Sequence, residues 1–225
     1  MADLQAHHDH VVVDYYSDIL CVWAWIAQRR IEELDEQWGK RVQLHYHCMD
    51  VFGDVPGKMA KQWQARGGYA GFAEHVKHSV QPFDHITLHA DLWHKTRPQS
   101  SFPAHLLIKA VALVAGESVS AQYALQLRRA FFEQAIDIGR KDLLLAEAEP
   151  LGVATAAIQA QLDSGRAYAA LMADYQKAKA EGLKGSPSYI LDGGRQVLFG
   201  NVGYRVLAAN VEELLRNPGD EASWC

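Results

Sequence analysis

Hydrophobic and polar residues follow two different periods along the first fifth of the chain. Residues 11–16 form a β-branched and aromatic run that is typical of a strand buried on both faces. From Trp23 to Trp38, apolar residues recur every three or four positions, which predicts an amphipathic helix that ends near Gly39. Residues 41–48 alternate between apolar and polar, as in a strand with two unequal faces. The chain is therefore predicted to open with a β-α-β unit.

The middle of the chain, from about residue 58 to residue 182, has helical periodicity and almost no strand signal. Ser100 and Ser101 followed by Pro103 are typical of a helix start, because a hydroxyl caps the first turn and proline removes no needed donor there. The predicted helices cover residues 100–116, 120–136, 141–151 and 155–180, the last broken at Ser164-Gly165, and residues 81–99 are predicted to form a loop.

Strand character returns near the C-terminus. Residues 188–191 and 196–199 are predicted to form a hairpin around Asp192-Gly193-Gly194. A last helix follows, with Asn201 as its candidate cap, and it ends at Asn217-Pro218-Gly219. The order predicts an α/β core built from residues 1–57 and 183–217, a helical insertion over residues 58–182, and a polar tail over residues 218–225.

Charge and hydropathy narrow the function classes. The chain has 225 residues, a net charge of -5 and no basic block, which argues against a nucleic-acid partner. Its first ten residues are polar and His-rich, and no apolar run approaches the roughly 20 residues that span a bilayer. We therefore expect a cytoplasmic protein without a membrane partner.

The three cysteines are too few and too scattered for a disulfide framework. Cys21 stands where the first predicted helix begins, and free amides and the helix dipole at that end favour a thiolate. A lowered pKa and nucleophilic chemistry are therefore predicted for Cys21, although a cysteine can also simply pack in a core. Cys48 falls on the apolar side of its strand and is predicted to be packed and inert. Cys225 ends the polar tail, where it could resolve a mixed disulfide or link two chains.

The eleven histidines do not form a metal-binding pattern. His45 and His47 lie on one face of the second predicted strand and Cys48 lies on the other, so the three cannot converge on one ion. His75 with His78 and His85 with His89 have helical spacing, but no recognisable ligand motif surrounds them. No metal site is predicted.

Gly185-Ser186-Pro187-Ser188 places a proline directly before the third predicted strand. Proline is tolerated at the first residue of a strand, because the ladder loses a donor only at its end. The functional interpretation is a cis Ser186-Pro187 bond that turns the backbone of Ser186 toward a substrate.

Taken together, these segments resemble a known family. The run Ser17-Asp18-Ile19-Leu20-Cys21-Val22-Trp23-Ala24-Trp25, the later Gly185-Ser186-Pro187-Ser188-Tyr189-Ile190 and the helical block between them are similar to DsbA-like proteins with a thioredoxin-like fold. The resemblance covers nearly the whole chain. It is to the cytosolic branch with FrnE-type oxidoreductases, 2-hydroxychromene-2-carboxylate isomerases and kappa-class glutathione transferases.

The motif around Cys21 departs from that family in an informative way. FrnE-type proteins carry C-P-W-C, whereas Cys21-Val22-Trp23-Ala24 keeps the first cysteine and the tryptophan but has no second thiol. An external thiol such as glutathione, or another cysteine of the chain, must then release a mixed disulfide. The isomerases and transferases tend to show serine in place of Cys21, and Ala24-Trp25 resembles them.

The resemblance implies a set of site residues and a cosubstrate. Cys21, Ser186 and Pro187 would carry the reaction, with glutathione as a cosubstrate and no tightly bound cofactor. Trp23, Gly200, Asn201 and Trp93 would contact glutathione or another substrate, although Asn201 could equally be a plain helix cap.

Three functions remain open from the sequence. The first is a thiol-disulfide oxidoreductase acting on glutathione or on protein and peptide disulfides. The second is a glutathione-dependent isomerase or transferase in which Cys21 only donates a hydrogen bond to the sulfur of bound glutathione. The third is a protein-binding module with a vestigial thiol. Fold alone does not separate them. The sequence does not determine the oligomeric state, although a homodimer is plausible because symmetric dimers are the commonest oligomers.

Overall fold

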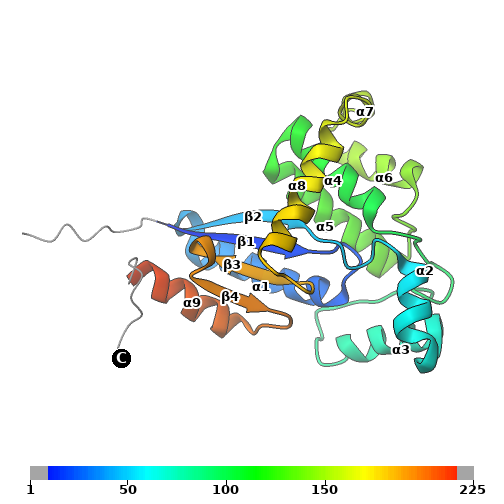
Figure 1. Ribbon diagram of the computed structural model, residues 1–225, viewed down its shortest axis with the longest axis horizontal. Helices are drawn as coiled ribbons and strands as arrows, with labels where there is room; N and C mark the ends of the chain where they lie inside the picture. The colour runs from blue at the N-terminus through cyan, green and yellow to red at the C-terminus, as the bar shows by residue number, and fades with distance from the viewer. Residues whose placement is uncertain (1–9, 217–225) are drawn as a thin grey trace, which may run out of the picture.

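Four strands form one mixed sheet in the order β2-β1-β3-β4 (Figure 1). The structure, a computed structural model, describes residues 10–216. β1 and β2 run parallel, as the helix between them requires, whereas β3 runs antiparallel to both β1 and β4. The strands are β1 Val11–Ser17, β2 Val42–Cys48, β3 Ser188–Leu191 and β4 Gln196–Phe199.

Helices cover both faces of the sheet. α1 (Val22–Trp38) and α9 (Tyr204–Arg216) pack on the face that carries Val13 and Tyr15. The next residue along β1, Tyr16, points to the opposite face because side chains alternate along a strand. There it packs against Ala178 of α8 (Arg166–Ala180). The predicted α/β core is therefore confirmed.

The insertion between β2 and β3 is helical, as its periodicity predicts. Figure 1 shows α2 and α3 apart from the group formed by α4 to α7. Gly165, with a φ of 76°, separates α7 from α8 at the predicted break, in a backbone conformation that favours glycine. The bounds are α2 Val55–Lys58, α3 Gly68–Val80, α4 Phe102–Ala115, α5 Glu117–Gln134, α6 Lys141–Ala148 and α7 Thr155–Asp163. Among residues 10–216, no helix is both long and apolar enough to cross a bilayer.

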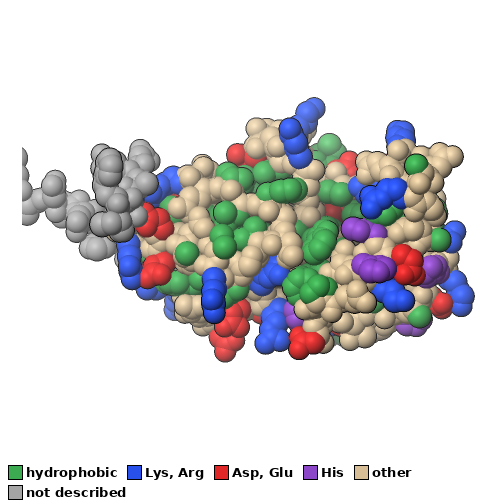
Figure 2. Space-filling view, turned by 90° about the horizontal axis from the view of Figure 1, so that it is seen from below, with side chains coloured by type: hydrophobic (Ala, Val, Ile, Leu, Met, Phe, Trp, Pro, Cys, Tyr) green, Lys and Arg blue, Asp and Glu red, His purple; other side chains and the backbone are tan. Residues whose placement is uncertain are grey.

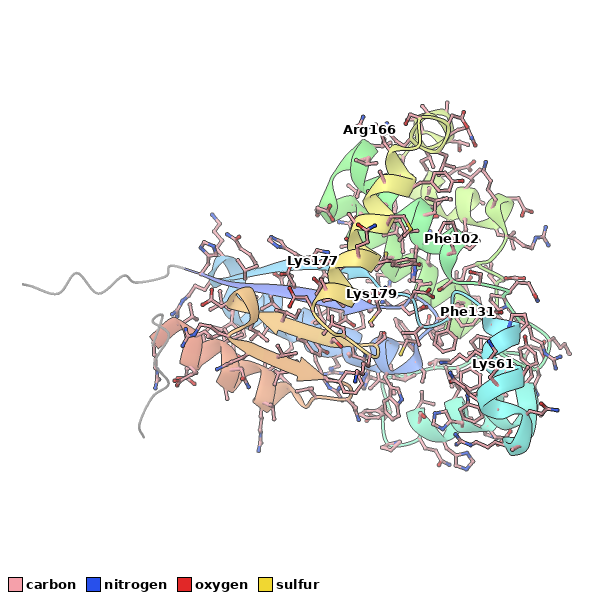
Figure 3. All side chains as sticks on the ribbon, in the orientation of Figure 1. Lys61, Phe102, Phe131, Arg166, Lys177 and Lys179 are labelled. Atoms are coloured by element: carbon pink, nitrogen blue, oxygen red, sulfur yellow. The ribbon has the colours of Figure 1, made fainter. Side chains whose placement is uncertain are left out.

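A partly buried charge network holds α8 against the sheet. His47 of β2 lies between two carboxylates, with Nε2 2.7 Å from Asp14 Oδ1 and Nδ1 2.9 Å from Asp174 Oδ1. Lys177, labelled on α8 in Figure 3, lies 3.0 Å from Asp14 Oδ2. Lys109 of α4 lies 3.0 Å from Asp174 Oδ2. Because α8 leads into the segment before β3, this network fixes the position of Ser186 and Pro187 relative to β1.

Candidate active site

Cys21 occupies the N-cap position of α1, directly after the short turn that follows β1. Its amide donates to the Asp18 carbonyl at 3.1 Å, which closes that turn. Only 6% of Cys21 is exposed, and its thiol donates a hydrogen bond to the backbone carbonyl of Ser186 at 3.2 Å. The structure therefore brings together the two residues that the sequence singles out, although they lie 165 positions apart.

The Ser186-Pro187 peptide bond is cis, as the functional interpretation of that segment expects. The Asp18 amide donates to the Ser186 hydroxyl oxygen at 2.9 Å, which joins this loop to the loop before Cys21. The Ser188 hydroxyl donates to the Gly185 carbonyl at 2.7 Å and holds the loop closed. Two independent hydrogen bonds thus position the Ser186 backbone beside the Cys21 sulfur.

The prediction of a lowered pKa for Cys21 is wrong. Burial raises the pKa of the Cys21 thiol, because the sulfur is removed from water and the charged form is penalised. Hydrogen bonds from the Ser186 side chain and from the Ala24 and Trp23 amides lower that pKa, but they do not outweigh burial. The Asp18 carboxylate adds to the increase. Cys21 therefore rests mainly as a protonated thiol near neutral pH.

Asp18 connects the loops around Cys21, a role that no local pattern in the sequence indicates. Its fully buried carboxylate accepts four hydrogen bonds. Ser101, expected to cap α4, instead turns its hydroxyl to Asp18 Oδ2 at 2.9 Å. The remaining three donors are the backbone amides of Leu20, Val51 and Phe52, at 2.8–3.0 Å. One carboxylate thereby ties together the Cys21 turn, the segment after β2 and the start of α4.

His105 supports the same turn from α4. Its Nε2 accepts a hydrogen bond from the Ile19 amide at 3.0 Å, and its Nδ1 lies 2.9 Å from the Tyr175 hydroxyl oxygen. Burial lowers the pKa of His105, which favours the neutral ring that can accept from an amide. His105 is a positioning residue, because its ring holds backbone rather than facing a pocket next to Cys21.

A pocket of about 300 Å³ opens beside Cys21. The cis-proline loop forms one side of it, and the segment from α2 to α3 forms the other. Its lining residues are Cys21, Val22, Trp23, Val51, Phe52, Lys58, Gln62, Trp63, Arg66, Phe72, His75, Gly185, Ser186 and Phe199. Five of these residues are Trp or Phe, so the pocket offers flat apolar surfaces as well as the thiol.

Two cations stand over aromatic rings in this pocket, and sequence reasoning missed both. The Lys58 ammonium lies 4.8 Å from the centre of the Phe52 ring, and the Arg66 guanidinium lies 3.9 Å from the centre of the Trp63 ring. No carboxylate among residues 10–216 lies within 4.0 Å of either one. We call Lys58 and Arg66 the cationic wall. It is available for an anionic group of a ligand.

His75 contributes no charge to the wall at neutral pH. Burial lowers its pKa, and the neighbouring charge of Arg66 lowers it further. Burial also lowers the pKa of Lys58, while Asp18 and Cys21 act in the opposite direction. The pocket is thus cationic at two defined points rather than along its whole lining.

The predicted ligand-binding residues fall into two groups. Trp23 lines the pocket, as expected. Trp93 does not: it is fully buried and packs against Phe72 and Phe131, with ring centres 4.9 and 5.4 Å away. The expectation that Trp93 contacts a ligand is therefore corrected, because its buried ring packs against the pocket residue Phe72 instead.

Gly200 and Asn201 lie just past the pocket rather than on it. The Gly200 amide donates to the Pro187 carbonyl at 2.9 Å, which attaches β4 to the cis-proline loop. Asn201 accepts a hydrogen bond from Arg30 at 2.7 Å. It does not cap α9, because that helix begins at Tyr204.

The other two cysteines stand differently. Cys48 is buried, as predicted, and it lines a separate small cavity rather than the Cys21 pocket. Burial raises the pKa of Cys48, and the Asp174 carboxylate raises it further, so its thiol stays protonated. Cys225 lies outside the described residues. Among residues 10–216, no group of three or more His, Cys, Asp or Glu side chains is placed to hold a metal ion.

The fold is shared with several solved structures. A protein from Nitrosomonas europaea described as a protein disulfide isomerase superposes with a TM-score of 0.78 at 16% identity, over 93% of this chain and 100% of its own. The cytosolic disulfide reductase DsbM from Pseudomonas aeruginosa superposes with a TM-score of 0.67 at 20% identity, over 91% of this chain and 98% of its own. A 2-hydroxychromene-2-carboxylate isomerase superposes with a TM-score of 0.68 at 19% identity, over 94% of this chain and 100% of its own. At these identities the likeness establishes the fold.

Sequence comparison identifies the family directly. No curated protein matches the chain. The family profile described as the DSBA-like thioredoxin domain matches residues 12–212, which includes Cys21, the whole helical insertion and the cis-proline loop. The chain therefore belongs to the DSBA-like thioredoxin domain family.

Proposed function

We propose that this protein is a thiol-disulfide oxidoreductase that works with one cysteine and uses glutathione as its cosubstrate. The observation that carries the proposal is the Cys21 sulfur at the edge of a 300 Å³ pocket, 3.2 Å from the Ser186 carbonyl. Ala24 stands where a C-x-x-C motif has its second thiol, and Cys48 faces another cavity. Among the described residues, no second thiol shares the Cys21 pocket.

The proposed reaction has two exchange steps. Cys21, after losing its proton, attacks the glutathione sulfur of a mixed disulfide, and the substrate thiol leaves and takes up a proton. The thiolate of a second glutathione then attacks the same sulfur, which restores Cys21 and gives oxidised glutathione. Overall, the mixed disulfide and one reduced glutathione give the substrate thiol and oxidised glutathione, so one disulfide is consumed, one is formed, and reduced glutathione is the reductant.

The cationic wall supports glutathione as the cosubstrate. Glutathione carries two carboxylates, and Lys58 and Arg66 are the cations that face the pocket. The DsbM reductase, which shares the fold at 19% identity, also has a structure with GSH. We place a carboxylate of glutathione at Lys58 and Arg66, and the peptide backbone along Ser186.

The decisive experiment follows the adduct on Cys21. Incubation with oxidised glutathione should add one glutathionyl group to Cys21, as detected by peptide mass spectrometry. Cys21→Ser should abolish glutathione-dependent reduction of a glutathionylated peptide, whereas the control Cys48→Ser should retain it. Undiminished turnover in Cys21→Ser would rule out the redox assignment. A Cys225→Ser variant tests the terminal thiol, and slower release of the adduct would assign it the resolving role.

A matched pair of lysines tests the cationic wall. Lys58→Met should raise the KM for glutathione roughly 5- to 30-fold, because an ion pair in a partly desolvated pocket contributes about 1–2 kcal/mol. Lys61→Met is the control: Lys61, labelled in Figure 3, is exposed and does not line the pocket. Equal KM values for Lys58→Met and the wild type would remove Lys58 from glutathione binding.

The aromatic lining favours a second candidate, a glutathione-dependent isomerase or transferase. Trp63 and Phe72 meet edge to face with ring centres 4.9 Å apart, and they could hold a flat aromatic substrate. In this mechanism the sulfur of glutathione is the nucleophile and Cys21 donates a hydrogen bond to it. Cys21→Ser should then keep its activity with an aromatic electrophile, and that activity should require reduced glutathione.

A further inference from the structure

Arg128 of α5 is a buried cation that has no carboxylate partner among residues 10–216. Only 4% of the residue is exposed, and its Nη2 donates to the Ser17 hydroxyl oxygen at 2.8 Å. Its Nε is completely buried and has no hydrogen-bond partner within residues 10–216. No carboxylate in that part of the chain lies within 4.0 Å of the guanidinium. This is unusual, because a buried charge without a counter-charge is costly.

The nearby buried acids are already occupied by other groups. Asp18 accepts its four hydrogen bonds from three backbone amides and Ser101. Asp174 is engaged by His47, Lys109 and the Cys48 amide. Neither carboxylate contacts Arg128, so the described part of the chain, residues 10–216, places no anion against this guanidinium.

Arg128 lines a small cavity between β2 and helices α4 and α5. The cavity measures about 30 Å³, which is the space of one or two water molecules. Ser17, Tyr46, Cys48 and Ala124 are among its other lining residues, and none of its lining residues is shared with the Cys21 pocket.

The lining provides hydrogen-bond donors but no negative charge. Burial raises the pKa of Tyr46 to about 12, so its hydroxyl keeps its proton and can donate. The pKa of Cys48 is also raised by burial, so this thiol cannot serve as the missing anion. The Ser17 hydroxyl accepts from Arg128 and retains its own proton for a ligand. A guanidinium with two hydroxyl donors is a suitable environment for an anion.

We propose that this cavity is a binding site for a small monovalent anion of the size of chloride, held by Arg128, Tyr46 and Ser17. The volume of about 30 Å³ suits an ion of this size better than the larger oxyanions sulfate and phosphate. The bound anion would compensate the charge of Arg128 and stabilise the junction of β1, β2 and α5. This site is independent of the proposed reaction at Cys21.

The first test is thermal unfolding in sodium gluconate that is progressively replaced by sodium chloride. Constant ionic strength keeps general charge screening unchanged. A ligand that binds only the folded state raises the unfolding midpoint with its concentration. The midpoint should rise with chloride in the wild type and in Arg129→Met, where the neighbouring exposed arginine is lost, but not in Arg128→Met. A chloride-independent wild type, or an equal rise in Arg128→Met, would overturn the proposal.

Crystals grown in sodium bromide give a test that needs no variant. Bromide scatters anomalously, and a peak within hydrogen-bonding distance of the Arg128 guanidinium would support the site. Density for water there, without an anomalous signal, would show that the cavity is hydrated and holds no anion.

Discussion

Replacing Asp18 by alanine should destabilise the fold more than any other single change at the Cys21 loops. The substitution leaves four donors without an acceptor: the buried amides of Leu20 and Phe52, the part-buried amide of Val51 and the buried Ser101 hydroxyl. Each unsatisfied buried donor costs about 1–3 kcal/mol, so the sum is roughly 4–12 kcal/mol. That range covers most of the ~5–15 kcal/mol by which ordinary domains are stable.

Two milder variants calibrate the prediction. Asp18→Asn keeps one acceptor oxygen in place of Oδ2, which serves three of the four donors, and turns an amide group toward the Leu20 amide. One clash between donors should cost about 1–3 kcal/mol. Ser101→Ala removes one donor and leaves the carboxylate with three, so its cost should be about 1.5–3 kcal/mol, the contribution of one hydrogen bond to a charged group.

Urea unfolding followed by tryptophan fluorescence measures all three variants. The expected order of destabilisation is Asp18→Ala well above Asp18→Asn, with Ser101→Ala close to the latter. A second readout is alkylation of Cys21, which should be faster in Asp18→Ala because the turn before the thiol is loosened. If Asp18→Ala unfolds within about 1 kcal/mol of the wild type, the four hydrogen bonds are not the main restraint on these loops.

Three further outcomes follow from the same contacts. Because burial raises the pKa of Cys21, its alkylation rate in Cys48→Ser should still be increasing above pH 8.5, roughly the pKa of a free cysteine; a plateau near pH 7 would contradict this. Although burial alone would raise the pKa of Asp174, hydrogen bonds from His47 and the charge of Lys109 hold it below 3.8. The stabilisation of the fold by ionised Asp174 is therefore complete above pH 3.8 and is lost as the pH falls through the lowered pKa. In urea titrations, the stability deficit of Asp174→Asn relative to the wild type should be large at pH 7 and shrink below pH 4. Gly185→Ala would bring a Cβ within 2.7 Å of the Phe199 ring. Because Phe199 is 62% exposed and its ring can swing away, the loss of stability should stay below about 1 kcal/mol while the KM changes. Unfolding of the variant would show that the ring is held in place.

The sequence predicts those parts of the fold that depend on local signals. Hydrophobic periodicity locates β1, α1 and β2, and the break at Gly165 follows from the need for positive φ. Cys21 and Ser186 could be paired in advance only through the family resemblance, because no local pattern connects residues 165 positions apart.

The cationic wall could not be predicted in the same way. Lys58 directly precedes a π-helical turn (Met59–Trp63), and Arg66 ends the 3₁₀ turn that follows it (Gln64–Arg66), so the helical period changes within a few residues. Which way a side chain points from such turns depends on the packing of Phe72 and Trp93 beneath them. The position of Trp93 could not be predicted for the same reason, because an aromatic residue in a loop can face either a pocket or the core. Here the Trp93 ring packs against Phe131 of α5 and therefore lies in the core.

Two opposing effects determine the charge of the Cys21 sulfur. Their magnitudes explain why a position at the start of a helix is not sufficient to keep the thiol ionised at neutral pH. The N-terminus of a helix stabilises an anion by about 0.3–1 kcal/mol, and by about 2 kcal/mol in favourable buried geometry. That corresponds to at most about 1.5 pKa units, whereas full burial can raise a pKa by about 3–5 units. The Ser186 carbonyl, which accepts from the thiol, also stabilises the protonated form.

It follows that Cys21 depends on its surroundings in the pocket for reactivity. A substrate that takes over the Ser186 carbonyl as its own hydrogen-bond acceptor would free the thiol from the bond that favours its protonated form. Lys58, which lines the pocket and interacts electrostatically with Cys21, would then stabilise the thiolate. The Lys58→Met variant should therefore slow alkylation of Cys21 at pH 7 as well as weaken glutathione binding, whereas Lys61→Met should change neither. An unaltered alkylation rate in Lys58→Met would show that the lysine acts on the ligand alone.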